Sequence, residues 1–254
     1  MSNKTIHRHI EMKWPEFKEF VKKTDYALLP VAALEQHGPH LPFGSDVYIA
    51  NGIAERVAEK TGALLMETLC YTPSFSLRYF PGTIHVSDEN LVRVILDIVE
   101  SMYRHGINTI YVLVGHVGAA AACKEAERKL LLNSEARIVN LVMAGMNEAV
   151  KTFCESKRWH STYIHAEEFE TSCVLAVQPD LVDMSKAVKE YPAIDPLFGP
   201  ISIPWNDFCQ SGVIGDATLA TPEKGRAMLD FMADKAVELI ELHRKELSRG
   251  RKFI

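Results

Sequence analysis

Residues 109–118 read TIYVLVGHVG and decide the fold class of this 254-residue chain. The first six are β-branched, aromatic or aliphatic, which is typical of a strand buried on both faces. Gly115 ends the strand, and a helix is expected over residues 119–132. A buried strand followed by a helix is the repeating unit of a parallel α/β sheet.

The same alternation continues in both directions along the chain. Ser87 and Thr221 are suitable N-cap residues for two of the expected helices. Residues 190–215 are rich in proline and glycine and are expected to form loops. The pattern predicts one α/β domain over residues 1–254, with further strands at 27–34, 63–69 and 137–142 and further helices at 47–60, 88–105, 167–177 and 222–247.

Composition excludes several classes of partner. The net charge of −5 and the pI near 6.1 give no basic surface for nucleic acid or for an anionic membrane. No apolar stretch reaches the length of a membrane span, and the N-terminus has no secretory signal pattern. Five scattered cysteines without a CxxC motif indicate reduced thiols in a cytoplasmic protein. The three tryptophans are too dispersed to predict an aromatic stacking platform.

Three segments carry candidate chemistry, and the first is LEQHGPHLPFGSD at residues 34–46. Ligands of parallel sheets bind beyond the carboxyl ends of the strands, where this segment lies. Glu35 and His37 are two residues apart, so in an extended chain their side chains leave the same face. With Asp46 they form a ligand set suited to Zn, Mn or Fe. The alternative is a polar turn in which Asp46 caps the next helix.

The second segment is GHVG at residues 115–118. His116 follows the clearest strand directly and is expected at the carboxyl edge of the sheet. Neither a GxGxxG nor a Walker motif is present, so a phosphate site is not indicated. His116 is therefore either a metal ligand or a structural histidine.

The third segment is YIHAEEFETS at residues 163–172. It contains His165 and three glutamates, of which Glu167 and Glu170 share one helix face and Glu168 points elsewhere. An acidic helix start, favoured by the helix dipole, would account for Glu167 or Glu168. The chain has no HExxH motif and no GxSxG elbow, so neither a zincin nor a serine nucleophile is predicted.

Taken together, these segments resemble the creatininase (creatinine amidohydrolase) family. The resemblance implies a three-layer α/β/α sandwich with a mainly parallel sheet, and assembly as a homo-oligomer, often a hexamer. It covers nearly the whole chain and is carried by the motifs ALLPVAALEQHGPHLPFGSD (27–46), FPGTIHVS (80–87), YRHGINTIYVLVGHVG (103–118), HAEEFETSCVLAVQPDLVD (165–183) and GVIGDATLATPEKG (212–225).

The resemblance also implies roles for individual residues. Metal ligands fall on Glu35, His37, Asp46 and His116, with Asp46 bridging two ions. Creatinine-hydrolysing members have a glutamate two residues after the GH histidine, where this chain has Gly118; Glu170 is the expected replacement. His165 matches the catalytic histidine. The acidic residue that precedes it and the tryptophan that closes over creatinine are replaced here by Ile164 and Ser161.

The function that the resemblance implies is metal-dependent hydrolysis of a small molecule. Two divalent ions, Zn and/or Mn with Fe as a further option, would activate a water that opens a cyclic amide at its C–N bond. His165 or an acidic neighbour would protonate the leaving group. Three alternatives stay open: a mononuclear enzyme, because of Gly118; a hydrolase that cleaves a ring C–C bond of a diketo-inositol; and a non-catalytic metal-binding scaffold.

Overall fold

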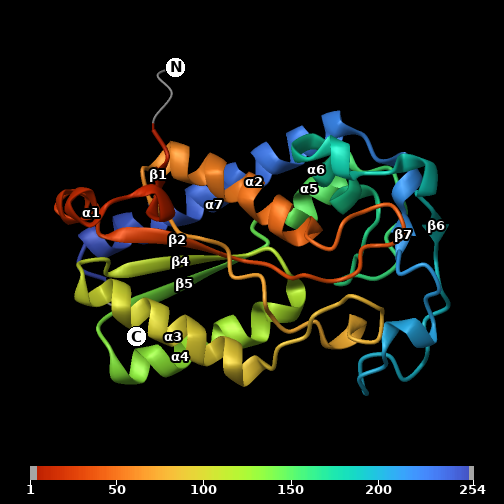
Figure 1. Cartoon of the computed structure of the whole chain (residues 1–254), viewed down its shortest axis with the longest axis horizontal. Coiled ribbons are helices and arrows are strands. Elements are labelled where there is room, and N and C mark those ends of the chain that lie inside the picture. The colour runs from red at the N-terminus through yellow and green to blue at the C-terminus, as the bar shows by residue number, and fades with distance from the viewer. Residues whose placement is uncertain (1–4, 252–254) are drawn as a thin grey trace.

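A five-stranded parallel sheet forms the centre of the computed structural model, which describes residues 5–251 (Figure 1). The strand order is β1-β3-β2-β4-β5, and every neighbouring pair is parallel. The strands are β1 (His7–Arg8), β2 (Tyr26–Val31), β3 (Leu64–Leu65), β4 (Thr109–Val114) and β5 (Arg137–Val142).

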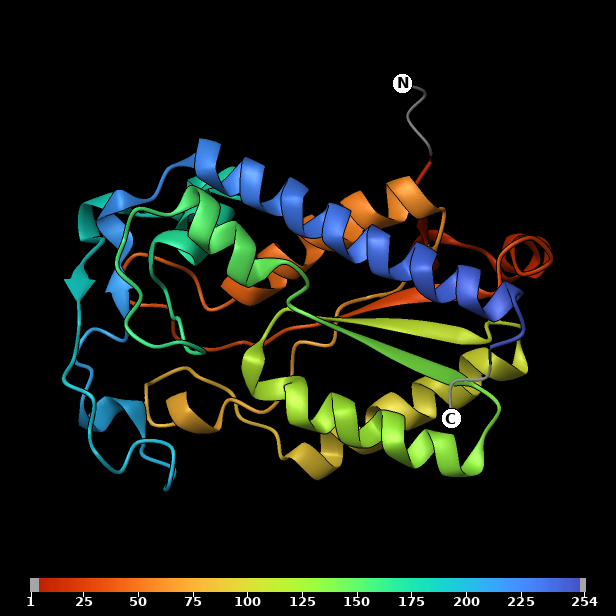
Figure 2. The same cartoon turned by 180° about the vertical axis from the view of Figure 1, so that it is seen from behind.

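Helices cover both faces of the sheet and make a three-layer sandwich (Figures 1 and 2). One core packs against α1 (Trp14–Phe20), α3 (Asp88–Arg104) and α4 (Ala120–Asn133). The other packs against α2 (Ser45–Thr61), α5 (Met146–Phe153), α6 (Glu168–Val177) and α7 (Pro222–Ser248). The predicted fold class is confirmed.

Strand β4 shows why the sheet needs helices on both sides. Tyr111 and Leu113 belong to the core under α2 and α7, whereas Ile110, Val112 and Val114 belong to the core under α3 and α4. Alternate side chains of a strand point to opposite faces, so an all-apolar strand must be covered twice. This is the feature that the TIYVLV segment predicts.

The helix ends follow the predicted capping chemistry. The Ser87 hydroxyl accepts a hydrogen bond from the N–H of Asn90 at the start of α3. Thr221 caps α7 in the same way, and Pro222 occupies its first turn, where a missing N–H costs nothing. Gly62 ends α2 with φ of 74°, in the left-handed region that favours glycine.

Long connections gather at the carboxyl end of the sheet, on the right of Figure 1. They include an antiparallel pair, β6 (Lys189–Glu190) with β7 (Gly215–Asp216). Short 3-10 helices lie at His9–Glu11, Phe75–Leu77, Val117–Ala119, Pro179–Leu181, Met184–Lys186, Trp205–Asp207 and Ala217–Leu219.

Five elements were not predicted, and one is shorter than predicted. The elements without an expected counterpart are β1, α1, α5, β6 and β7, and β3 covers only Leu64–Leu65 of the expected 63–69. A two-residue strand is too short for a periodic pattern. Among residues 5–251, no helix has both the length and the apolar composition required to cross a bilayer.

Candidate metal centre

Four of the predicted ligands lie at one edge of the sheet, in the segments that follow two neighbouring strands. Glu35 and His37 lie in the segment after β2, and His116 comes two residues after β4. Asp46 lies in the first turn of α2. Because β2 and β4 pair along their whole length, their carboxyl ends meet, and all four side chains are brought together.

The turn before α6 adds His165 and Glu170. Ala166 lies between them with φ of 51°, a left-handed conformation that residues other than glycine rarely adopt. Its N–H donates a hydrogen bond to Glu170 Oε2 at 2.5 Å and so holds the carboxylate on the His165 side. His165 Nδ1 lies 3.9 Å from both Glu170 Oε2 and Glu35 Oε1. The α6 segment therefore joins the strand-end cluster.

The other two glutamates of this segment have structural partners. Glu167 is the N-cap of α6 and accepts a hydrogen bond from the N–H of Phe169 at 3.0 Å. Glu168 is fully buried, lies 2.5 Å from Lys224 Nζ and also accepts backbone N–H groups of the preceding loop. The acidic helix start thus accounts for these two residues and leaves Glu170 facing the cluster.

Asp46 stands between two halves of the cluster. Its Oδ1 lies 3.2 Å from His37 Nε2, and its Oδ2 lies 3.1 Å from His116 Nδ1. Glu35 Oε1 is 3.3 Å from the same nitrogen of His116, and Glu170 Oε2 is 3.7 Å from His37 Nε2. Within 4.8 Å, the ligand atoms form three overlapping groups: Glu35, Asp46 and His116; His37, Asp46 and Glu170; and Glu35, His37 and His165.

In each of the three imidazoles, the ring nitrogen that points away from the carboxylates (the outer nitrogen) forms a hydrogen bond with a main-chain carbonyl. The contacts are His37 Nδ1 to Glu35 O at 3.1 Å, His116 Nε2 to Pro73 O at 2.8 Å, and His165 Nε2 to Gln36 O at 2.7 Å. A carbonyl can only accept, so each outer nitrogen carries the ring proton. The inner nitrogen of each neutral ring then presents a lone pair to the carboxylates, as in metal-ligating histidines.

Lone pairs that face carboxylates require a positive charge between them. Burial lowers the pKa of His37, but the Asp46 carboxylate outweighs burial and raises it to about 10. Burial also opposes protonation of His116, and Glu35 outweighs it and raises that pKa well above its usual value. Burial raises the pKa of Glu170 to about 8. Without metal, these groups therefore retain protons at positions that suit a cation.

Two buried oxygens in the cluster, Glu35 Oε2 and Asp46 Oδ2, have no hydrogen-bond partner. Within the part of the chain that the structure describes, no lysine or arginine lines the adjoining cavity. The three carboxylates, with Glu170 as the third, therefore lack a permanent side-chain counter-charge, which buried charges need. Imidazole nitrogens and carboxylate oxygens suit Zn and Mn. The donors present fit divalent metal binding.

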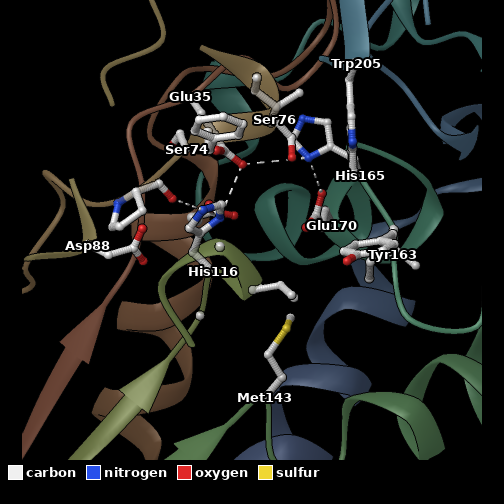
Figure 3. A pocket seen from close by; sticks show the side chains of 18 residues that line it. Glu35, Ser74, Ser76, Asp88, His116, Met143, Tyr163, His165, Glu170 and Trp205 are labelled. Carbon is white, nitrogen blue, oxygen red and sulfur yellow. Dashed lines mark hydrogen bonds and ion pairs between the residues drawn. The ribbon is translucent and has the colours of Figure 1, made fainter. Parts of the chain in front are cut away.

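The cluster borders a cavity of about 230 Å³. In Figure 3 the side chains of Glu35, His116, His165 and Glu170 are turned toward one another at this cavity. The rest of its wall is mainly apolar, with Phe75, Leu77, Val117, Met143, Ile164 and Trp205, and its further polar side chains are Ser74, Ser76, Asp88 and Tyr163.

The family model for creatininase, described as creatinine amidohydrolase, matches residues 10–240. The chain belongs to the creatininase family. Creatinine amidohydrolase of Pseudomonas putida is 30% identical over 245 residues, which cover 91% of this chain and 94% of that protein. 3-dehydro-scyllo-inosose hydrolase of Thermotoga maritima is 28% identical over 260 residues, which cover 91% of this chain and 82% of that protein. The predicted family and enzyme class, a metal-dependent hydrolase, are confirmed.

A solved mutant creatininase of the Zn–Zn type has the same fold, with a TM-score of 0.82 at 27% identity. The match covers 93% of this chain and 97% of that one. Creatininase has also been solved as a manganese form, with the same TM-score and identity over 94% of this chain and 99% of that one. These two solved creatininases are zinc and manganese forms, and the donor set of this creatininase-family chain suits both kinds of ion.

Gly118 stands where the resemblance implies a glutamate in the creatinine-hydrolysing members of the creatininase family. A Cβ atom at this position would lie 2.3 Å from His116 Nε2 and 2.6 Å from Pro73 O. In this structure a side chain here would therefore require the His116 ring or the Pro73 carbonyl to shift. Glu170, which lies beside His37 and Asp46, is the carboxylate available in its place.

Two of the three tryptophans, which are dispersed in the sequence, come together in the fold. Trp159 and Trp205 lie in one aromatic cluster, where both contact Phe208. Trp205 also packs edge-on against His165 and lines the cavity. Residues so far apart in sequence give no local pattern, and only the folding of the 190–215 loops brings them together.

Sequence reasoning also missed the residues that orient the cluster. The carbonyl groups of Gln36 and Pro73 leave no trace in the residue type, since every residue has one. His40 did have a signal, because it stands three residues after His37 in HGPH. It is 2% exposed, and its Nε2 forms a hydrogen bond with the Thr171 hydroxyl at 2.9 Å.

Proposed function

We propose that this protein is a metal-dependent hydrolase that opens a small cyclic amide at its C–N bond. One observation carries the proposal: three buried carboxylates face three imidazole nitrogens whose tautomers are set by main-chain carbonyls. Such a set needs compensating positive charge, which metal ions would supply and which protons on the rings supply in their absence. A purely structural polar cluster would instead be satisfied by its own hydrogen bonds.

Two ions are the proposed complement of each subunit. Glu35, Asp46 and His116 would hold one, and His37, Asp46 and Glu170 the other, with Asp46 shared. A divalent ion in this setting lowers the pKa of water toward neutrality and polarises a carbonyl oxygen. We assign Zn or Mn on the basis of the donor types, with Fe as a third option.

His165 is the proposed proton carrier. Its Nε2–H is engaged by Gln36 O, so Nδ1 is the free acceptor at the cavity. Burial, together with the nearby charge of His37, lowers its pKa to about 4, which keeps the ring neutral at pH 7. The attacking water loses a proton to Nδ1 as its oxygen bonds to the carbonyl carbon. The same proton then passes to the ring nitrogen of the substrate as the C–N bond breaks.

The cavity supports a compact ring as substrate. Its volume of about 230 Å³ excludes a long chain from full enclosure, and most of its wall outside the metal cluster is apolar. Hydroxyl groups buried there without partners would each cost about 1–3 kcal/mol. Ser76, Asp88 and Tyr163 are polar exceptions. They support the second candidate, C–C cleavage of a keto-inositol, which the relative from Thermotoga maritima also suggests.

The remaining assignments belong to the same proposal. Residues 1–254 would act as one domain, and the subunits would assemble as a homo-oligomer, with a hexamer expected from the family. The partner would be a small molecule, without nucleic acid or membrane. Free cysteines at positions 70, 123, 154, 173 and 209 support a cytoplasmic location.

The test combines metal analysis with a substrate panel of creatinine, a formamido-pyrimidine and keto-inositols. Plasma mass spectrometry should find about two ions per chain, and one ion would favour the mononuclear alternative. His116→Ala should lose metal and turnover, whereas His105→Ala, at an exposed position at the end of α3, should keep both. Full activity in a metal-stripped sample would end the proposal.

A second variant tests the proton carrier. His165→Gln should retain about two ions but lose roughly 10²–10⁴-fold in turnover, the usual contribution of general acid–base catalysis. Wild-type turnover in this variant would remove the assigned role. A protein that binds metal but hydrolyses nothing in the panel, at any pH from 6 to 9, would favour the scaffold alternative.

A further inference from the structure

The peptide unit of Ala166 is held from both sides. Its N–H donates to Glu170 Oε2, and its carbonyl accepts a hydrogen bond from the Thr171 hydroxyl at 3.3 Å. The residue is fully buried and has φ of 51°. Conformations of this kind persist only where the surroundings impose them, and they concentrate at functional sites.

Thr171 connects the Ala166 peptide to a further buried side chain, His40. Its hydroxyl has one proton, which it gives to the Ala166 carbonyl, so it can only accept from His40. His40 Nε2 therefore carries the ring proton and donates it to Thr171 Oγ1 at 2.9 Å. The relay runs in one direction, from His40 through Thr171 to Ala166.

His40 is anchored away from the cavity. Its own carbonyl accepts the N–H of Asp183 at 3.0 Å, and its Nδ1 is buried without a partner. It is absent from the groups of possible metal ligands among residues 5–251 and does not line the cavity. Its one side-chain hydrogen bond in the described chain is the bond to Thr171.

We propose that His40 and Thr171 are positioning residues, which fix the Ala166 peptide so that Glu170 faces His37 and Asp46. The inference rests on the proposed function, since it assigns the relay to one half of the metal pair. It makes a selective claim, because among residues 5–251 no hydrogen bond or ion pair joins Glu35, Asp46 or His116 to the side chains of this relay or to the Ala166 peptide. Loss of the relay should lower the affinity for one of the two ions and leave the affinity for the other unchanged.

The experiment is a Zn²⁺ titration of metal-free protein that resolves two binding steps. Removal of an outer partner of a ligand typically costs 10–100-fold in metal affinity. We therefore expect Thr171→Val, which keeps the shape and removes the hydroxyl, to weaken one step by about 10-fold or more. Thr171→Ser keeps the hydroxyl and should retain both affinities.

His40 is tested in the same way. His40→Leu should weaken the same step as Thr171→Val, and the double variant should be no weaker than either single one, because both break one relay. In His40→Gln, the side-chain amide can still donate near the Nε2 position and should restore most of the affinity.

A neighbouring hydroxyl provides the matched control. Ser172 is fully buried in the same helix, and its Oγ accepts the N–H of Thr221, outside the relay. Ser172→Ala should lower the melting temperature but leave both zinc affinities unchanged. If Thr171→Val instead weakens both steps equally or neither, the relay is overturned. If the wild type binds no zinc, the proposed function itself fails.

Discussion

Metal uptake by this protein should release protons. The metal-free cluster keeps protons on His37, whose pKa the Asp46 carboxylate raises to about 10, and on His116, whose pKa Glu35 raises well above its usual value. A metal ion must take the inner nitrogen of each ring and so must displace both protons. His165, with a pKa lowered to about 4, has none to give.

The size of the effect follows from the pKa. A pH of 7 is 10 − 7 = 3 units below the His37 pKa of about 10. Removing the proton from this ring at pH 7 therefore costs about 4 kcal/mol. Each displaced ring proton makes the apparent metal affinity rise about tenfold per pH unit. With two rings, the product of the two affinities should rise about 100-fold per unit between pH 6.5 and 8.5. Glu170 adds to this slope below its pKa of about 8.

Calorimetry in two buffers of different ionisation enthalpy counts the protons directly. We expect at least two per chain for zinc at pH 7. Release of less than one proton, together with an affinity that is flat from pH 6.5 to 8.5, would refute the reasoning, because the rings would then be neutral before metal arrives.

Three further predictions concern stability. The raised pKa of His37 stabilises the metal-free fold fully below pH 6.5, and this stability is lost as the pH rises through about 10. The melting temperature of the metal-free protein should therefore fall between pH 6.5 and 10, whereas that of the metal-loaded protein should not. Lys224→Met leaves the Glu168 carboxylate buried without its cation; urea unfolding should show a loss of about 3 kcal/mol, with part recovered by adding Glu168→Gln. Ala166→Val should cost about 1–3 kcal/mol because a β-branched residue resists positive φ, whereas Ala166→Gly should unfold within about 1 kcal/mol of wild type.

The fold was predictable where the chain repeats one simple rule. Strands β2, β4 and β5 are apolar runs of ordinary length, and the helices α2, α3 and α7 carry caps and apolar stripes at helical spacing. The rule does not predict β1, because this strand depends on pairing with β3 from another part of the chain. The two residues of β1 become a strand because the rest of the sheet offers a pairing partner, and their own sequence does not specify a strand.

The candidate site was predictable in its donors but not in their orientation. Glu35, His37, Asp46 and His116 follow strands whose carboxyl ends meet, so their convergence follows from topology. Which nitrogen of each ring faces inward depends on carbonyl groups placed by the loops, and residue types do not encode it. The choice of Glu170 over its two acidic neighbours rested on the family pattern, and the contacts of Glu167 and Glu168 supply its physical reason.

The attachment of all three imidazoles to backbone oxygens has an evolutionary consequence. Every amino acid offers the same carbonyl, so point mutations at positions 36 and 73 can change the side chains there and leave the acceptors in place. Insertions and deletions in these loops would move the acceptors and tilt the rings. The family should therefore tolerate drift in cavity walls, and hence in substrates, far better than changes in loop length around the centre.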